Sequence, residues 1–181
     1  MEKTIRKTAA KITQETLFIL LTVAGAVILP QILHLIGAQV GVGGQLGQML
    51  LPMYLPVMIL GFYRGACSGA IVGLIAPLVS FALTAMPAEK LLPYIAIELV
   101  ATGLLAGLFA KVQLPAMLRV FTVQVLAKAV RLISLTTVLL VSGQQVTSAA
   151  LTAGILTSVP GLILQLLVVS YIIVKKDKAN G

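Results

Sequence analysis

Six long apolar stretches follow one another along the chain, separated by short segments rich in glycine, proline or charge. An α-helix needs about 20 mostly apolar residues to cross the hydrocarbon core of a bilayer. The pattern therefore predicts an all-α integral membrane protein, a single domain over 1–181 with six transmembrane helices. We expect these helices at about 16–36, 50–63, 67–84, 92–110, 117–141 and 149–174.

The second and third stretches meet in the sequence GFYRGACSGAIVG, residues 61–73, where four glycines recur every four residues. In a helix this spacing places glycines in one row, and small residues let membrane helices approach closely. Arg64 is the only charged residue between Glu15 and Glu89. We expect a tight hairpin between two spans, with the glycines forming a packing face.

Between the first two stretches, residues 37–50 contain five glycines, three glutamines and no charge. Glycine at this density opposes a stable helix. The segment is predicted to be a re-entrant or lid-like outer loop, with an ordinary connecting loop as the alternative. Pro52 and Pro56 follow, and prolines inside a helix predict a kink near the outer end of the second span.

Composition supports the membrane assignment. The chain is 59% apolar and 10% charged, with a mean hydropathy of +1.09, whereas soluble domains carry about 25% charged residues. A chain with so few charges cannot cover its surface with polar groups. The apolar run at 16–36 is also longer than the core of a signal peptide, so we expect it to remain as the first span.

The net charge of +8 does not mark a nucleic-acid-binding face, because the basic residues gather at the chain ends and at turns. With six spans, both termini share one side of the membrane. Ten of the thirteen basic residues fall on that side, against Lys90 alone on the other. The positive-inside rule then predicts cytoplasmic termini, with 1–15 and 175–181 as basic cytoplasmic segments. The ten are Lys3, Arg6, Lys7, Lys11, Arg64, Lys111, Arg119, Lys175, Lys176 and Lys178.

Three ionisable residues lie inside predicted spans, where they are costly and indicate function. Arg131 is twelve residues beyond Arg119, or roughly 18 Å along a helix, and Glu98 lies roughly 9 Å below the outer face. Both fall in the outer half of the membrane, so they are predicted to pair or to meet a polar ligand. Lys128, one turn from Arg131, either shares this site or points elsewhere.

Neutral polar residues near the outer side complete a predicted pocket for a small polar organic molecule. They include His34, the only histidine, and Tyr54, Gln45, Gln48 and Gln165. A lone histidine and a single cysteine predict no metal site, and no cofactor is expected. There is no phosphate-binding loop and no nucleophile–histidine–acid arrangement, so we expect neither ATP hydrolysis nor another enzymatic activity.

Four stretches resemble the substrate-binding (S) components of energy-coupling factor (ECF) vitamin transporters. They are AVILPQILH, LLPMYLPVMILGFYRGACSGAIVGLIAPLVSFALTAMP, IAIELVATGLLAGL and VPGLILQLLV, in the expected order and over most of the chain. The resemblance implies a six-helix subunit of a prokaryotic plasma membrane that captures a vitamin or precursor from outside.

The resemblance also implies partners: a membrane-embedded T component and two ATPase subunits. Members of this family contact the T component through small residues of the first helix, which places Thr22, Ala24 and Ala26 at the docking face. Arg131 and Lys128 suit a carboxylate or phosphate, as in pantothenate, our first choice. Glu98 suits a pyridoxine-like or hydroxymethylpyrimidine-like ring. The alternative function is a self-sufficient ion-coupled carrier or channel that uses Glu98.

Overall fold

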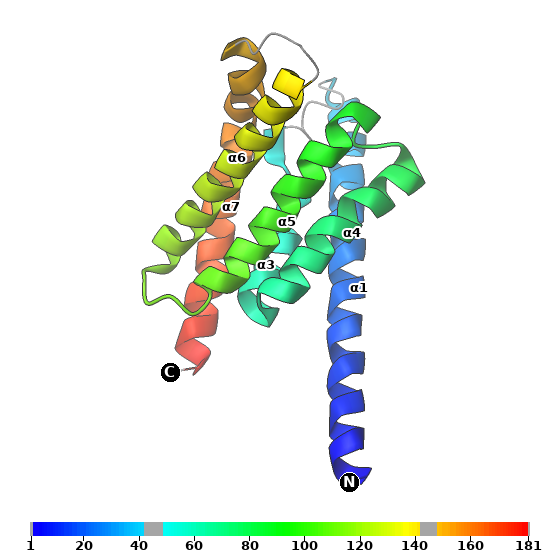
Figure 1. Ribbon diagram of the computed structural model, residues 1–181, viewed down its shortest axis with the longest axis vertical. Coiled ribbons are helices and arrows are strands. Elements are labelled where there is room, and N and C mark those ends of the chain that lie inside the picture. The colour runs from blue at the N-terminus through cyan, green and yellow to red at the C-terminus, as the bar shows by residue number, and fades with distance from the viewer. Residues whose placement is uncertain (1, 42–48, 142–147, 181) are drawn as a thin grey trace.

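The structure is a computed structural model that describes residues 2–41, 49–141 and 148–180. For residues 2–5, 7–11, 148–154 and 180 it describes the backbone only. The described part contains six α-helices and one short 3-10 helix (Figure 1). They are α1 (Glu2–Gln39), α3 (Tyr54–Arg64), α4 (Ala66–Thr84), η1 (Glu89–Leu91), α5 (Leu92–Phe109), α6 (Ala116–Val141) and α7 (Ser148–Asn180).

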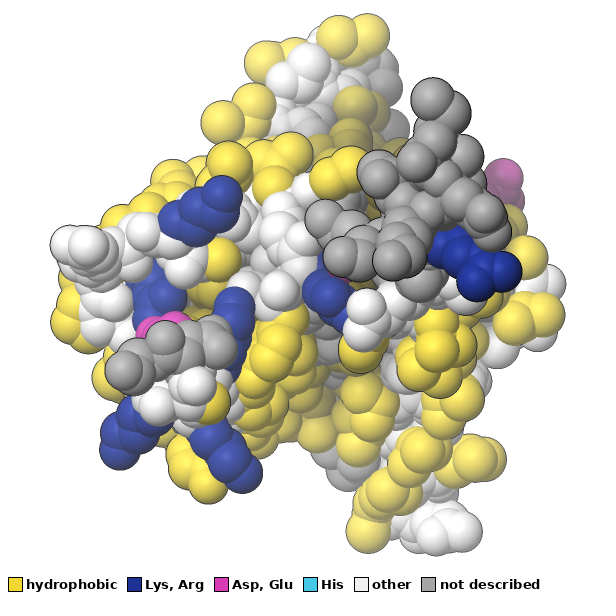
Figure 2. Space-filling model, turned by 90° about the horizontal axis from the view of Figure 1, so that it is seen from below, with side chains coloured by type: hydrophobic (Ala, Val, Ile, Leu, Met, Phe, Trp, Pro, Cys, Tyr) yellow, Lys and Arg dark blue, Asp and Glu magenta, His cyan; other side chains and the backbone are white. Residues whose placement is uncertain are grey.

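Five of these helices are long and apolar enough to cross a membrane, namely α1, α4, α5, α6 and α7. Many large apolar side chains on their outer faces are exposed. Figure 2, which views the molecule from below, shows such side chains around its flanks. Exposed apolar surface on this scale needs lipid as its solvent. The chain is a multi-pass membrane protein.

The second predicted span differs from the structure. In place of a helix over 50–63, α3 has only 11 residues, too few to cross the bilayer alone. The expected kink is absent because Pro52 lies before the helix and Pro56 lies in its first turn. A first-turn proline needs no hydrogen-bond partner for its nitrogen, so the two prolines define where α3 begins.

The predicted glycine row is divided between two helices. The chain turns at Gly65, whose φ of 98° suits glycine, so Gly61 lies on α3 while Gly69 and Gly73 lie on α4. All three nevertheless face α5. A Cβ atom added to any of them would lie less than 3.0 Å from backbone atoms of Gly103 or Leu99. The predicted packing face therefore exists, and it is built across the hairpin.

Helix α3 occupies the centre of the bundle and contributes to two buried apolar clusters. With α1, α4 and α5 it forms one cluster around Val57, Val72 and Leu99. With α5, α6 and α7 it forms another around Phe62, Val123 and Val169. The short helix thus joins the two sides of the bundle, and its first residue, Tyr54, is held by buried neighbours.

Both chain ends lie at the same end of the bundle in Figure 1, together with the α3–α4 and α5–α6 turns. Polar contacts tie the helices together there. Arg64 pairs with Glu15 of α1 at 3.2 Å, Arg119 of α6 pairs with Asp177 of α7, and the Lys176 ammonium donates to the Phe62 carbonyl at 2.6 Å. Figure 2 shows the Lys and Arg side chains gathered on this end.

The predicted segment boundaries are otherwise close to the structure. The basic N-terminal residues, expected as a cytoplasmic segment before the first span, continue α1 as helix from Glu2. Residues 37–39, expected to begin the glycine-rich loop, also belong to α1. In the rest of the predicted loop, residues 40 and 41 form a turn, 49 and 50 are helical, and 42–48 lie outside the described residues.

Candidate functional site

A buried cluster of charged groups lies where α3, α5 and α6 meet. Glu98 of α5 is 1% exposed. Its Oε2 atom accepts hydrogen bonds from the Tyr54 hydroxyl at 2.7 Å and from Arg131 Nη1 at 3.0 Å. Its other oxygen, Oε1, lies 2.5 Å from Lys128 Nζ, an ion pair without hydrogen-bond alignment. We call these four residues the charge cluster.

Helix geometry explains why these residues meet. Lys128 and Arg131 are three residues apart, so they project from the same face of α6, and one carboxylate reaches both. Glu98 lies at the matching depth on α5, as the rise per residue indicated. The structure thus contains the predicted Glu98–Arg131 pair, and it places Lys128 at the same site. A buried carboxylate is tolerable in a membrane only with such partners.

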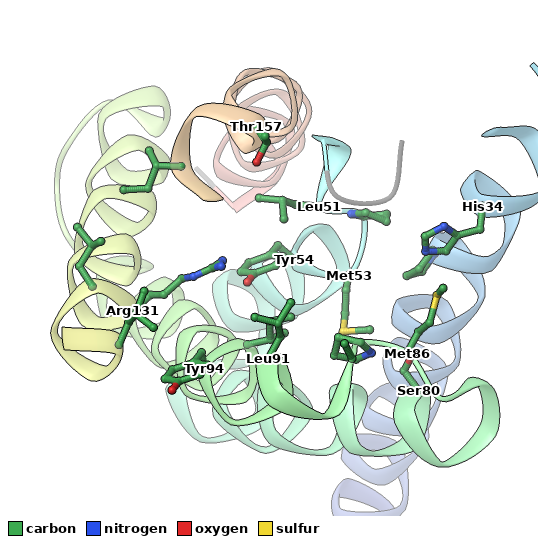
Figure 3. Close-up of a pocket in the computed structure, with 18 of the residues that line it drawn as sticks. His34, Leu51, Met53, Tyr54, Ser80, Met86, Leu91, Tyr94, Arg131 and Thr157 are labelled. Carbon is green, nitrogen blue, oxygen red and sulfur yellow. The ribbon is translucent and has the colours of Figure 1, made fainter. Parts of the chain in front are cut away.

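A cavity of about 560 Å³ opens beside the charge cluster, in the half of the bundle away from the chain ends. Arg131 and Tyr54 form part of its wall, whereas Glu98 and Lys128 lie behind them and do not line it. Much of the remaining wall is apolar, including Leu51, Met53, Leu91, Ile95, Leu132 and Leu135. Figure 3 shows the arrangement, with Arg131 and His34 at opposite ends.

Two of the other predicted site residues can be placed. His34 lines the cavity from α1. Gln165 is 1% exposed and is not among the residues that line this cavity. It faces inward because α7 packs this side against the bundle. Gln45 and Gln48 lie outside the described residues.

Gln165 instead supports the cavity wall. Its amide nitrogen donates a hydrogen bond to the Leu51 carbonyl at 3.2 Å, and its oxygen accepts one from Gln124 at 3.4 Å. Leu51 has a φ of 46°, unusual for a branched residue. One helical turn earlier, Gly161 lies so close to residues 49 and 50 that a Cβ atom would collide with their backbone. These contacts from α7 fix the segment that leads into α3.

We expect Gln165→Leu to loosen this segment while keeping the side-chain volume. The Leu51 carbonyl and the Gln124 amide would lose a partner, at a cost of about 1–3 kcal/mol for a buried polar group. Hydrogen exchange of residues 49–54 should become faster. The control is Gln113→Leu, which removes an exposed glutamine in the α5–α6 turn. Unchanged exchange in Gln165→Leu would show that this hydrogen bond does not hold the segment.

Three polar residues of the cavity wall were not predicted from the sequence: Ser80, Tyr94 and Thr157. Ser80 is 1% exposed and is the only polar residue between Ser68 and Thr84. An isolated hydroxyl in an otherwise apolar span is a signal from which Ser80 could have been predicted to face the site. Tyr94 lies near the start of α5, where polar residues are common in membrane helices and carry little information. Thr157 lies well inside α7, where a single threonine carries little information by itself.

The three residues of α1 predicted to dock a partner differ in their exposure. Ala26 is 0% exposed and belongs to the buried cluster with α3 and α4, so it is not part of the surface of α1. Ala24 is exposed. Thr22 lines an apolar groove of about 570 Å³ between α1, α3 and α7, and its hydroxyl is bonded to the Phe18 carbonyl. The sequence could not show which face of α1 packs inward.

Within the described ranges, no three His, Cys, Asp or Glu side chains gather as a metal site would require. No protein-family model, curated protein or solved structure gives a significant match to the chain. The function must therefore follow from the charge cluster and the cavity beside it.

Proposed function

We propose that the chain is the substrate-capture subunit of an ECF-type importer that takes up a small water-soluble vitamin or precursor. The observation that supports this most directly is the charge cluster opening into the cavity through Arg131 and Tyr54. The cavity volume of about 560 Å³ lies in the range typical of sites for small organic ligands. Its mostly apolar wall with a few polar groups is also typical of such sites.

A purely structural ion cluster explains less. Replacing a buried ion pair by apolar packing is often neutral or stabilising, so pairing alone is a weak reason to keep three charges in a membrane. A cluster that served only to join α5 and α6 would also not require a cavity. Here one of the cations forms part of the cavity wall, where a ligand would reach it.

The orientation follows from charge. The exposed Lys111, Lys175 and Lys178 belong to the end of the bundle where the chain ends lie. By the positive-inside rule this end is cytoplasmic, and the cavity then faces the outside of a prokaryotic plasma membrane. This is the orientation that a capture subunit needs.

Energy would come from partners, because the sequence carries no nucleotide-binding motif of its own. In the proposed complex a membrane-embedded T component links the chain to two ATPase subunits. On α1, the surface open to such a partner includes Ala24 and Thr22 but not Ala26. The rival function, an ion-coupled carrier using Glu98, would need this carboxylate to exchange its cation. Lys128 and Arg131 already hold both of its oxygens.

The test is binding by the purified protein in detergent, without ATP. We expect one compound from a panel of water-soluble vitamins and precursors to bind at 1:1 stoichiometry and raise the melting temperature. Native mass spectrometry would report the stoichiometry and thermal shift the stabilisation. Absence of binding, together with proton-driven uptake by the protein alone in liposomes, would favour the carrier. Absence of both would leave a structural role.

A further inference from the structure

The charge cluster contains more positive than negative charge. Lys128 and Arg131 face the single carboxylate of Glu98, which leaves one excess positive charge. The chain has five acidic residues, and among the described side chains only Glu98 pairs with Lys128 and Arg131. Glu15 pairs with Arg64 and Asp177 with Arg119, Glu89 is exposed on η1, and Glu2 begins α1.

The segments outside the described residues cannot supply the missing negative charge. Residues 42–48 and 142–147 contain no acidic residue. An unbalanced cation beside an apolar cavity in a membrane is costly. An anion entering the cavity would balance it, whereas a cationic ligand would double the excess.

The positions of the charged groups point the same way. Glu98 lies behind the wall and both of its oxygens are occupied, so it is poorly placed to receive a cationic ring. Arg131 lines the cavity. Its guanidinium donates a hydrogen bond to Glu98 through Nη1. A guanidinium has five N–H donors in a planar fork that matches a carboxylate.

The other end of the cavity carries polar groups of a different kind. His34 and Ser80 lie there, far from Arg131 in Figure 3, and neither side chain has a hydrogen-bond partner among the described residues. Between the two ends the wall is mostly apolar, with Leu51, Met53 and Leu91, and also includes Thr157. The cavity is thus cationic at one end, mostly apolar in the middle and hydrogen-bonding at the other end.

We propose that the cavity selects an elongated organic monoanion, with its acid group against Arg131 and a polar group at His34 and Ser80. This inference rests on the proposed function, since it names the class of molecule that is captured. It separates the two ligand classes that the sequence left open, because it favours an acid over a neutral or cationic ring.

The experiment compares acids with neutral analogues of the same skeleton: pantothenate with panthenol, nicotinate with nicotinamide, and 4-pyridoxate with pyridoxine. Isothermal titration of the purified protein should show at least one acid binding roughly 10- to 150-fold more tightly than its neutral partner. In Arg131→Gln, which leaves Glu98 and Lys128 balanced, that ratio should fall toward one. Arg131→Lys keeps the charge and should retain part of the preference. Arg64→Gln, the same change at the far end of the bundle, should leave it intact.

A second substitution tests the end of the cavity that contains His34. His34→Leu should weaken binding of the acid and of its neutral partner by similar factors, leaving their ratio unchanged. The proposal is overturned if a neutral or cationic compound binds as tightly as any acid, an outcome that leaves the capture function standing. It is also overturned if the ratio survives in Arg131→Gln. If no compound of the wider vitamin panel binds, the capture function fails and the ligand class falls with it.

Discussion

Glu98→Gln should produce the largest loss of stability of any single isosteric substitution in the charge cluster. Glutamine has nearly the same shape, so no void opens, and Tyr54 can still donate its hydrogen bond. What disappears is the one negative charge that, among the described side chains, pairs with Lys128 and Arg131. Removing one partner of a buried ion pair typically costs about 3–5 kcal/mol, because the other charge remains buried without compensation.

The free energy of unfolding in mixed detergent and SDS micelles would measure this loss. Glu89→Gln is the matched control, since it neutralises an exposed carboxylate on η1 and should change stability by less than about 0.5 kcal/mol. A second substitution provides a rescue. Lys128→Met in the Glu98→Gln background removes one uncompensated cation and should recover part of the loss. A Glu98→Gln variant as stable as the unmodified chain would mean that these charges are not buried together.

The depth of the charge cluster was predictable, because the rise of a helix and the thickness of a bilayer are both fixed. Counting residues from Arg119 and from the outer face was enough to predict that Glu98 and Arg131 lie at the same depth in the membrane. The role of Lys128 was not predictable in the same way. Whether its side chain joins Arg131 at α5 depends on how α6 is rotated, and that rotation is decided by packing.

The faces of the helices were the least predictable feature. In a soluble helix the polar face marks the solvent, but here lipid and core are both apolar. Ala26 and Ala24 are therefore equivalent in the sequence, although one is buried and the other exposed. Gln165 shows the same limit: a polar residue in a span must face inward, but it can meet a backbone carbonyl instead of a cavity.

The start of α3, and therefore its length, could have been predicted from the position of its prolines. Pro52 and Pro56 predict a kink only if the helix has already begun before them. Proline is better tolerated in the first turn than later, and on that rule the helix should begin close to Pro56. A start at Tyr54 brings the tyrosine hydroxyl to Glu98 at the head of the helix.

After Glu98→Gln, Gly103→Ala should cause the next largest loss of stability, because the added methyl group has no room. Gly103 of α5 meets Gly69 of α4 backbone to backbone, at the most extensive helix–helix contact of the described structure. A Cβ atom at Gly103 would collide with the Gly69 carbonyl and Cα, and backbone atoms cannot rotate out of its way. Overpacking of this kind typically costs about 1–3 kcal/mol. Since α5 also carries Glu98, its displacement should disturb the charge cluster.

Gly25→Ala is the matched control for this substitution. Gly25 lies within α1, and a Cβ atom there would meet nothing within 4 Å. Alanine favours a helix over glycine by roughly 0.5–1 kcal/mol, so Gly25→Ala should leave stability unchanged or raise it. Adding one methyl group is thus expected to lower the stability at Gly103 but to leave it unchanged or raise it at Gly25. If Gly103→Ala also proved neutral, the close contact between α4 and α5 would be contradicted, and with it the position of Glu98 against α6.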